Sequence, residues 1–252
     1  MEKPDNRNKI SAGSYDLNKW LFGGYDKDII TTIYGPAGCG KTNLCMMAAA
    51  SAARHGGKVI FIDTEGGFSA ERFKQLMGEK EKEKGDTEKA LANVLLLKPT
   101  TFEEQWDAFG KLLKEIKSDK EISLIVVDGM TMLYRLLIAE SKSDKRKIDE
   151  INSVLARQMR MLAEIARKRN IPVLATNQVY YEFLSQEELE AGKEKTANMV
   201  GGDIMKYWSK CIIELKNNRG KRTLILKKHR SLPEKELAFE IFNLGIRKKG
   251  WL

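Results

Sequence analysis

Eight consecutive residues in this chain of 252 have the types and the spacing of a phosphate-binding loop. Residues 35–42 read GPAGCGKT, in which the glycines allow a tight turn that points successive backbone N–H groups at phosphate oxygens. Lys41 brings a positive charge to the β- and γ-phosphates of a nucleotide, and the Thr42 hydroxyl can ligate Mg²⁺. The residues expected to hold the nucleotide are Gly35, Pro36, Ala37, Gly38, Cys39, Gly40, Lys41, Thr42 and Asn43.

The residues on either side of the loop strengthen this interpretation. The apolar, β-branched stretch 26–34 is typical of a strand, and the Ala-, Met- and Leu-rich stretch 43–54 is typical of a helix whose N-terminus favours anions. The competing interpretation is a glycine-rich turn with no ligand, which does not require these flanks. The sequence therefore predicts a site for ATP and Mg²⁺, in which Cys39 could also be a reactive thiol.

Asp128 is the first of three polar residues that end predicted strands and could complete the chemistry. It follows the apolar run of residues 122–127, 86 positions after Thr42, and a carboxylate placed there can hold Mg²⁺ through water. Apolar runs that end in aspartate also occur by chance in α/β proteins. The order of the motifs, with a further strand between them, favours the metal-binding interpretation.

Glu65 and Gln178 are the other two candidates. Glu65, in the stretch IDTEGGF, is a candidate general base that polarises an attacking water, and a turn carboxylate or a helix cap is an equally good interpretation. Asp63 is the weaker candidate because we expect it to be buried at the strand end. Gln178 could sense the γ-phosphate and pass that state to the following segment, or it could be a plain strand-end amide. Together with Lys41, Glu65 and Gln178 form the expected catalytic set.

Strand and helix patterns alternate along the chain, and this order predicts how the candidate residues are positioned. Short apolar runs are typical of strands buried on both faces of a parallel sheet. Residues 102–117 and 151–166 repeat apolar side chains at helical spacing, and we expect Trp106 in the core. The predicted strands are 58–67, 94–98, 122–129 and 171–179, then an antiparallel hairpin of 211–215 and 222–228 and a last strand near 238–243. The fold class is therefore α/β, with a mostly parallel central sheet flanked by helices and an antiparallel C-terminal extension.

Composition excludes some classes of protein and favours a polyanionic partner. The chain has no run of about 18 apolar residues, no secretory pattern at its N-terminus and only three cysteines, so we expect a cytoplasmic protein with no membrane partner. The net charge is +9. Residues 216–230 hold seven Lys or Arg and no acid, and residues 142–169 hold nine against four acids. Such clusters are typical of nucleic-acid binding, although a solvated surface would also carry them.

Four motifs together resemble the ATPase core of the RecA/RadA-type recombinases. They are residues 35–42, 61–73, 124–135 and 175–179, in the order and spacing of that family. The likeness continues through residues 201–215 and 228–246 and is strongest to the short archaeal paralogues of the RadB group. It implies one RecA-like P-loop ATPase domain over residues 1–252. Only nine residues precede the segment that opens the core, so we expect no helical N-terminal DNA-binding domain.

By this resemblance, DNA contacts come from two loop segments. They correspond roughly to residues 135–147 and 179–202, which combine cations for phosphates with aromatic side chains for unstacked bases. The acidic run 187–190 dilutes the charge of the second segment, so we expect the basic C-terminal hairpin to contribute more. The candidate DNA-binding residues are Arg135, Lys145, Arg146, Lys147, Tyr180, Lys221 and Arg222, with Lys142, Tyr181, Phe183, Lys193 and Lys195 in the same segments.

The resemblance also places residues 227–234 in the loop that caps ATP from an adjacent subunit. Lys228 stands where full-length archaeal and eukaryotic recombinases carry an aspartate, so the cap of this chain is basic. Lys227, Lys228 and Arg230 could therefore neutralise charge at the γ-phosphate across an interface. Contact with DNA is the equal alternative for these three cations.

RadB-like proteins are expected to bind DNA, to hydrolyse ATP slowly and not to exchange strands on their own. The resemblance thus implies an ATP-binding, DNA-binding recombinase paralogue in homologous recombination and DNA repair, a mediator or regulator associated with the nucleoid. Its implied partners are DNA, preferably single-stranded, and the main recombinase, a junction nuclease or a polymerase, with self-association also open. The alternatives are a KaiC-like signalling ATPase without a DNA role, which the basic clusters disfavour, and a full strand-exchange recombinase.

Overall fold

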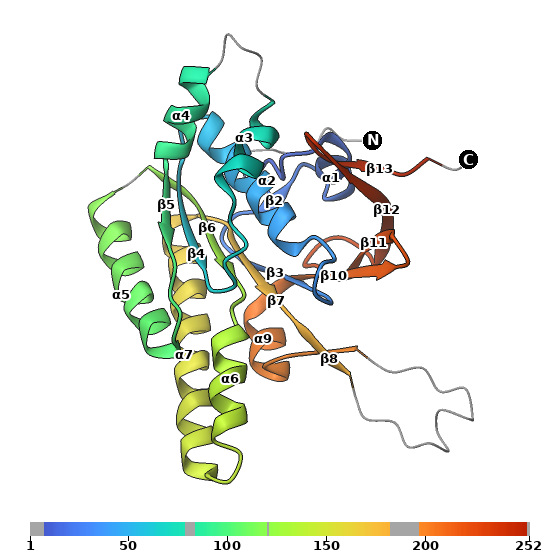
Figure 1. The fold of residues 1–252 in the computed structure, drawn as a ribbon. Coiled ribbons are helices and arrows are strands. Elements are labelled where there is room, and N and C mark those ends of the chain that lie inside the picture. Colours follow the sequence, from blue (N-terminus) through green and yellow to red (C-terminus); the bar gives the residue numbers. More distant parts are fainter. Residues whose placement is uncertain (1–7, 79–83, 120, 182–196, 251–252) are drawn as a thin grey trace, which may run out of the picture.

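A nine-stranded mixed sheet organises the molecule (Figure 1). The computed structural model describes residues 8–78, 84–119, 121–181 and 197–250. The strands of the large sheet lie in the order β13-β12-β11-β10-β3-β7-β6-β4-β5. Their bounds are β3 Ile30–Tyr34, β4 Lys58–Asp63, β5 Val94–Leu97, β6 Ile122–Asp128, β7 Val173–Asn177, β10 Ser209–Asn218, β11 Lys221–Lys228, β12 Lys235–Phe242 and β13 Gly245–Lys248. The six strands from β5 to β10 are parallel, and β11, β12 and β13 extend the sheet in antiparallel fashion.

Helices cover both faces of this sheet, and two small pairs of strands lie outside it. The small pairs are β1 Lys9–Ile10 with β2 Tyr25–Asp26, and β8 Val179–Tyr181 with β9 Ala197–Met199. The helices are α1 Tyr15–Trp20, α2 Lys41–Arg54, α3 Ala70–Met77, α4 Lys84–Ala92, α5 Phe102–Ser118, α6 Met132–Glu140, α7 Lys145–Arg169 and α9 Gly202–Trp208. Figure 1 shows α2, α3 and α4 near one another and α5, α6 and α7 grouped apart from them.

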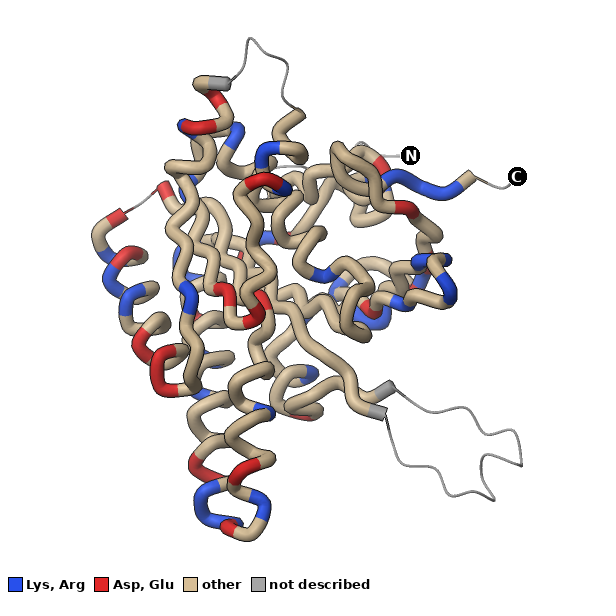
Figure 2. Tube along the Cα trace, viewed as in Figure 1, with Lys and Arg blue, Asp and Glu red and all other residues tan. Residues whose placement is uncertain are grey.

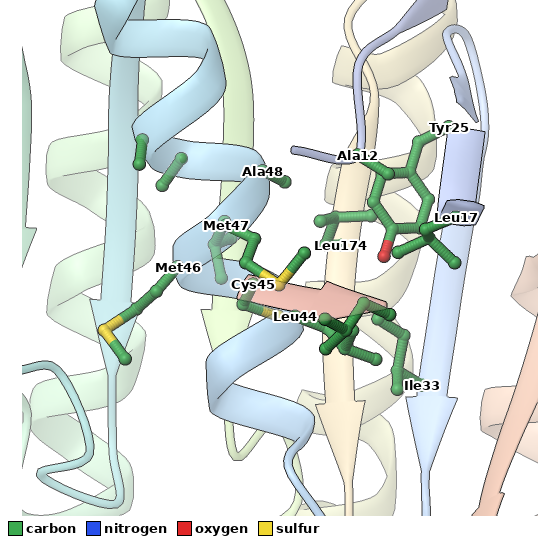
Figure 3. Close-up of a cluster of buried hydrophobic side chains, with 14 of the residues drawn as sticks. Ala12, Leu17, Tyr25, Ile33, Leu44, Cys45, Met46, Met47, Ala48 and Leu174 are labelled. Carbon is green, nitrogen blue, oxygen red and sulfur yellow. The ribbon is translucent and has the colours of Figure 1, made fainter. Parts of the chain in front are cut away.

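The parallel strands are apolar on both faces because each face carries its own core. In β4, Val59 and Phe61 pack into the core under α2, whereas Ile60 and Ile62 pack into the core under α5 and α7. This two-sided burial explains why the run lacks the apolar–polar alternation of a half-exposed strand. Figure 3 shows the α2 side, where Leu44 and Met47 of the helix lie among the buried side chains.

Four neighbouring strands bring the candidate residues to one edge of the sheet. In the order β3-β7-β6-β4, these strands are all parallel, so their carboxyl ends lie side by side. The register pairs Tyr34 with Asn177 and Asp63 with Asp128. Ligands of open α/β sheets bind at this edge, outside the carboxyl ends of the strands. The topology therefore gathers the phosphate loop, Asp128, Glu65 and the segment after β7 in one place.

The predicted elements are confirmed for the parallel sheet, and the structure differs from prediction elsewhere. Residues 135–147, expected as a loop, instead form the end of α6, a short turn and the first residues of α7. Trp106, expected in the core, keeps 39% of its surface exposed. The helix α4, the strand β13 and the β8–β9 pair are among the elements that were not predicted. Within the described residues, no helix is long and apolar enough to span a membrane.

Candidate nucleotide site and nucleic-acid interface

The phosphate loop joins β3 to α2 in a conformation that its glycines permit. Gly38 and Gly40 have φ values of 70° and 109°, a region that side chains with a Cβ rarely adopt. Gly40 is the residue that precedes the first turn of α2, so the N-terminus of that helix opens on the loop. The Lys41 ammonium lies over the loop, 3.0 Å from the carbonyl oxygens of both Gly35 and Pro36. These features place a cation and a helix N-terminus where phosphates would lie.

Asp128 is buried at the end of β6 and keeps one oxygen unpaired near α2. Its Oδ1 accepts a 2.6 Å hydrogen bond from the Thr176 hydroxyl, while its Oδ2 has no hydrogen-bond partner among the described residues. Burial raises the pKa of Asp128 to about 6, although the hydroxyls of Thr176 and Thr42 oppose the rise, and the nearby carboxylate of Glu65 adds to it. A buried anion with an unshared oxygen beside a threonine hydroxyl fits a divalent cation, which prefers oxygen ligands.

The described residues contain no cluster of three or more His, Cys, Asp or Glu side chains that could enclose a metal ion. Thr42 and Asp128 would therefore supply only part of a coordination shell. Mg²⁺ is commonly held in this way, by one or two protein oxygens together with substrate phosphates and water.

Glu65 and Gln178, predicted as separate candidates, are in direct contact. The Gln178 amide donates from Nε2 to Glu65 Oε1 at 3.0 Å. The Glu65 side chain also lies against Gly129, where a Cβ would come within 2.7 Å of Glu65 Cγ and 2.3 Å of the Thr64 hydroxyl. A side chain at position 129 would therefore displace Glu65. Asp63, as expected, is buried, and it accepts hydrogen bonds from the backbone N–H groups of Gly67 and Phe68.

The sequence motifs did not identify the residues that hold these groups in place. The Thr176 hydroxyl accepts from the Gly129 N–H at 2.7 Å and donates to Asp128, so it fixes the carboxylate and the turn that follows it. Asn177, fully buried, bonds to Thr131 and to the Val200 carbonyl. The only sequence signal for Thr176 and Asn177 was their place at the end of an apolar strand.

Cys39 is not the reactive thiol that its place in the loop suggested. Its side chain is fully buried, and burial raises its pKa although the Lys41 ammonium opposes the rise. A protonated, inaccessible thiol is a poor nucleophile. Cys45 and Cys211 are also free and buried, with pKa values raised by burial.

The first candidate DNA segment runs from the first turn of α6, next to the sheet, to the first turn of α7, at the far end of a helical hairpin. Arg135 is exposed on α6, and Lys145, Arg146 and Lys147 are exposed in the first turn of α7. Figure 1 shows that α6 and α7 run together away from the sheet, and Figure 2 shows basic and acidic residues side by side at their tip. The cations there are Lys142, Lys145, Arg146 and Lys147, which could contact a phosphate backbone, and the acids among them are Glu140, Asp144, Asp149 and Glu150.

The second candidate segment and the C-terminal hairpin are only partly described. Tyr180 in β8 is 45% exposed. Lys221 is exposed at the start of β11, with Arg222 beside it, next to the turn that joins β10 to β11. Phe183, Lys193, Lys195 and the acidic run 187–190 lie outside the described residues.

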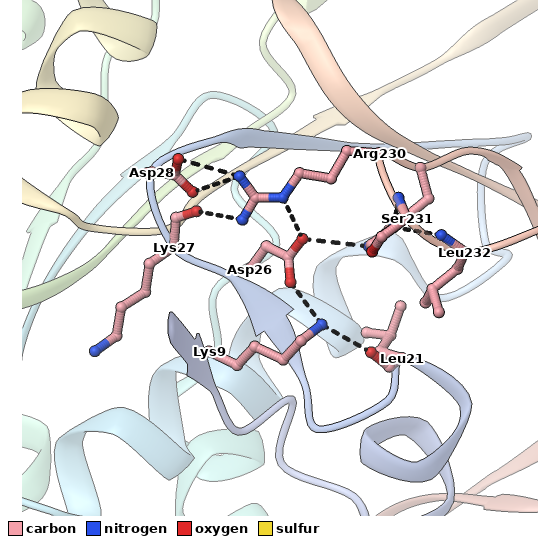
Figure 4. Close-up of polar contacts among 9 residues, drawn as sticks. Lys9, Leu21, Asp26, Lys27, Asp28, Arg230, Ser231 and Leu232 are labelled. Atoms are coloured by element: carbon pink, nitrogen blue, oxygen red, sulfur yellow. Dashed lines mark hydrogen bonds and ion pairs between the residues drawn. The ribbon is translucent and has the colours of Figure 1, made fainter. Parts of the chain in front are cut away.

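The basic cap residues are engaged within their own chain. Arg230 forms ion pairs with Asp26 at 3.0 Å and Asp28 at 2.9 Å, as Figure 4 shows. Lys227 pairs with Glu234 at 2.5 Å, and the Lys228 ammonium donates to the Lys206 carbonyl at 2.9 Å. All three cations lie at or just after the end of β11, on the antiparallel side of the sheet, and the partners of Arg230 precede β3 whereas the phosphate loop follows it.

His229, next to them, is buried against the same acid. Its Nε2 lies 3.4 Å from Asp26, and its Nδ1 accepts from the N–H groups of Ser231 and Leu232. Burial lowers the pKa of His229, although Asp26 opposes the change. The neutral imidazole thus stabilises the turn of residues 229–232 and holds it against Asp26.

Comparisons with known proteins agree with this geometry. Residues 5–249 match the Rad51 family. The chain is 38% identical over 231 residues to the DNA repair and recombination protein RadB of Methanococcus maripaludis strain C7, covering 91% of this chain and 96% of that protein. It is 39% identical over 230 residues to the protein of the same name from Methanocaldococcus jannaschii, covering 91% and 98%. A crystal structure of the RadB recombinase is similar with a TM-score of 0.73 and 32% identity, covering 96% of this chain and 100% of that one.

Proposed function

This chain belongs to the Rad51 family of RecA-like proteins and to its RadB group, and from that premise we propose that it is an ATP- and DNA-binding protein of homologous recombination and repair. It acts as a mediator or regulator with weak ATPase activity and little strand exchange of its own. The observation that carries the proposal is the meeting of Lys41, Asp128 and the Glu65–Gln178 pair at one sheet edge.

Lys41, Thr42 and Asp128 bind the nucleotide in this proposal. Lys41 exchanges its two carbonyl contacts in the loop for phosphate oxygens, and the backbone N–H groups of the loop surround the same phosphates. Thr42, and the free oxygen of Asp128 through water, would hold Mg²⁺, which would supply positive charge to the phosphates. The Thr176 hydroxyl keeps Asp128 oriented for this task.

Glu65 and Gln178 act as a linked pair. Glu65 orients the attacking water and accepts its proton, and Gln178 binds one oxygen of the same carboxylate. A change in the position of Glu65 therefore changes the position of Gln178, which precedes β8 and the second DNA segment. Hydrolysis resets this pair, so the nucleotide acts as a switch for DNA or partner binding.

Slow hydrolysis follows from the positions of the cap cations. Lys227, Lys228 and Arg230 bond to groups of their own chain and lie beyond β10, so they can reach a γ-phosphate only across an interface with a second protomer. An isolated protomer thus lacks that part of the charge neutralisation that phosphoryl transfer needs. Self-association, or assembly with the main recombinase, would complete it.

DNA is held in this proposal by the α6–α7 tip, by Tyr180 and by the β10–β11 turn. Single-stranded DNA is the preferred form because its phosphates can meet the cations of the tip while its bases stack on exposed aromatic rings. A junction nuclease or a polymerase remains a candidate partner. The protein works at the nucleoid in the cytoplasm.

A salt titration of single-stranded DNA binding tests the DNA role. The triple variant K145A/R146A/K147A should weaken binding and reduce the slope of log K against log salt by about 2, because each phosphate contact contributes roughly 0.7. The control is K111A/K114A/K117A, which removes the same charge from exposed positions of α5 and should leave the slope unchanged. Equal slopes for both variants would refute the tip as a DNA site, and no binding at low salt would favour a signalling ATPase.

A further inference from the structure

Asn177, at the end of β7, connects three segments through polar contacts. Its carbonyl accepts from the N–H of Gly35, the first residue of the phosphate loop, at 3.3 Å. Its side-chain Oδ1 accepts from the Thr131 hydroxyl, and its Nδ2 donates to the Val200 carbonyl at 2.7 Å. Asn177 is fully buried and Thr131 is 1% exposed. Asn177 is thus hydrogen-bonded to the phosphate loop, to the start of α6 and to Val200, the residue after β9.

The Thr131 hydroxyl bonds to Asn177 and does not cap the N-terminus of α6, although Thr131 is the N-cap residue of that helix. It is the N-cap residue of α6, where a threonine oxygen usually accepts from a backbone N–H of the first helical turn. Among the described residues, the Thr131 side chain caps no such group, and its hydroxyl donates to Asn177. The helix loses a stabilising cap, and a local rule broken at a buried position indicates a role outside the helix.

Both backbone polar groups of Val200 are hydrogen-bonded to consecutive residues, Asn177 and Gln178, at the end of β7. Asn177 binds its carbonyl, and the carbonyl of Gln178 accepts from its N–H at 3.1 Å. Gln178 is also the residue that binds Glu65. Gly201, which follows, lies so close to Thr131 that a Cβ there would be 3.3 Å from the threonine methyl. The start of α6 and the end of the β8–β9 pair, from which the two candidate DNA segments extend, therefore contact each other and the end of β7 at the candidate nucleotide site.

We propose that Asn177 is a positioning residue that couples the nucleotide site to the start of the α6–α7 hairpin and to the base of the β8–β9 pair, with Thr131 as its partner. The inference rests on the proposed function only in that the ligand is a nucleotide. A displacement of Gly35 or Gln178 moves Asn177, and its buried amide cannot release Thr131 or Val200 without leaving polar groups unpaired. The start of α6 and the residues after β9 must therefore move together with Asn177.

Amide hydrogen exchange with and without a nonhydrolysable Mg–ATP analogue tests this coupling. In the wild type, the analogue should slow exchange by about tenfold in residues 131–140 and in residues 197–205. T131V removes the hydroxyl at nearly constant shape and should abolish the change in 131–140 while leaving that in 197–205. T131S keeps the hydroxyl and should restore the wild-type response, which a merely structural role of the threonine methyl would not predict. N177A should abolish both changes.

Nucleotide affinity, DNA affinity and the melting temperature of each variant are measured alongside. T131V should bind the analogue within about threefold of wild type, because the loop residues are unchanged. If T131V keeps the full response in 131–140, or if saturating analogue changes neither segment in the wild type, the coupling is refuted. Should N177A fail to fold, T131V and T131S decide the question without it. If the wild type does not bind DNA at all, the proposed function is overturned, but the coupling between the nucleotide site and the two segments is not.

Discussion

The substitution D128N should stabilise the protein at neutral pH in the absence of nucleotide. Burial raises the pKa of Asp128 from 3.8 to about 6, so the charged carboxylate is less favourable in the folded chain than in the unfolded chain. At about 1.4 kcal/mol for each pH unit, this difference amounts to about 3 kcal/mol. The D128N substitution removes the charge and keeps an oxygen for the hydrogen bond from Thr176.

The pH dependence follows from the raised pKa. An acid whose folded pKa is raised destabilises the folded chain as pH increases from its unfolded value through its folded value. The penalty at Asp128 is therefore absent below about pH 4, grows between about pH 4 and about pH 6 and is complete above that range. D128N should gain up to about 3 kcal/mol at about pH 7.5, roughly 2–4 °C in Tm for each kcal/mol, and little at about pH 4.

Thermal and urea unfolding at both pH values, with and without Mg²⁺ and an ATP analogue, measures this effect. The analogue should stabilise the wild type more than D128N, because D128N lacks the anion that holds the metal. D63N is the matched control: Asp63 accepts two backbone N–H groups, so an amide there leaves one unsatisfied and should cost about 1–3 kcal/mol. A D128N protein that is less stable than wild type at neutral pH, or whose gain is the same at acidic pH, would refute this account of Asp128.

Three further predictions concern single side chains. E65Q should lower ATP hydrolysis by about 10²–10⁴-fold with nucleotide affinity little changed, measured by steady-state turnover and by equilibrium binding; undiminished turnover would exclude Glu65 as the base. T176V should destabilise the protein by about 1–3 kcal/mol in urea unfolding, because the Gly129 N–H and Asp128 lose a partner; an unchanged midpoint would count against this bond. Cys39 should resist alkylation at mildly alkaline pH until the chain unfolds, because it is buried and its pKa is raised; rapid labelling of the folded protein, read by mass spectrometry, would contradict this.

The candidate nucleotide site at the carboxyl edge of the sheet could be predicted because the sequence patterns that indicate it are local. A buried parallel strand is a short apolar run, and the residue that ends it lies at the carboxyl edge whatever the rest of the chain does. Asp128, Glu65 and Gln178 were placed in this way, and the structure brings them together at one edge. The pairing of Gln178 with Glu65 depends on strand order, which no local pattern reveals.

The remainder of the fold depends on contacts between distant segments. Residues 135–147 correspond to a loop of the resembled family and become polar from residue 140 onward, yet Asp144 caps α7 by accepting from the Lys147 N–H. The helix α7 therefore begins earlier than its apolar stripe. Trp106 follows the helical spacing of the apolar residues of α5 but lies 39% exposed. Thr131 and Asn177 lie within motifs whose assigned roles belonged to Asp128 and Gln178, and the bond between them joins residues 46 positions apart, which no local pattern reveals.

The affinity of single-stranded DNA with and without a nonhydrolysable Mg–ATP analogue tests the central claim most directly. The claim is that nucleotide bound at Lys41 controls DNA binding. The wild type should change its DNA affinity by about fivefold or more when the analogue is added, the usual range of coupling between two sites. K41A should show one affinity under both conditions. A wild type whose DNA affinity does not respond to saturating analogue, or a K41A protein that responds like wild type, would contradict the claim.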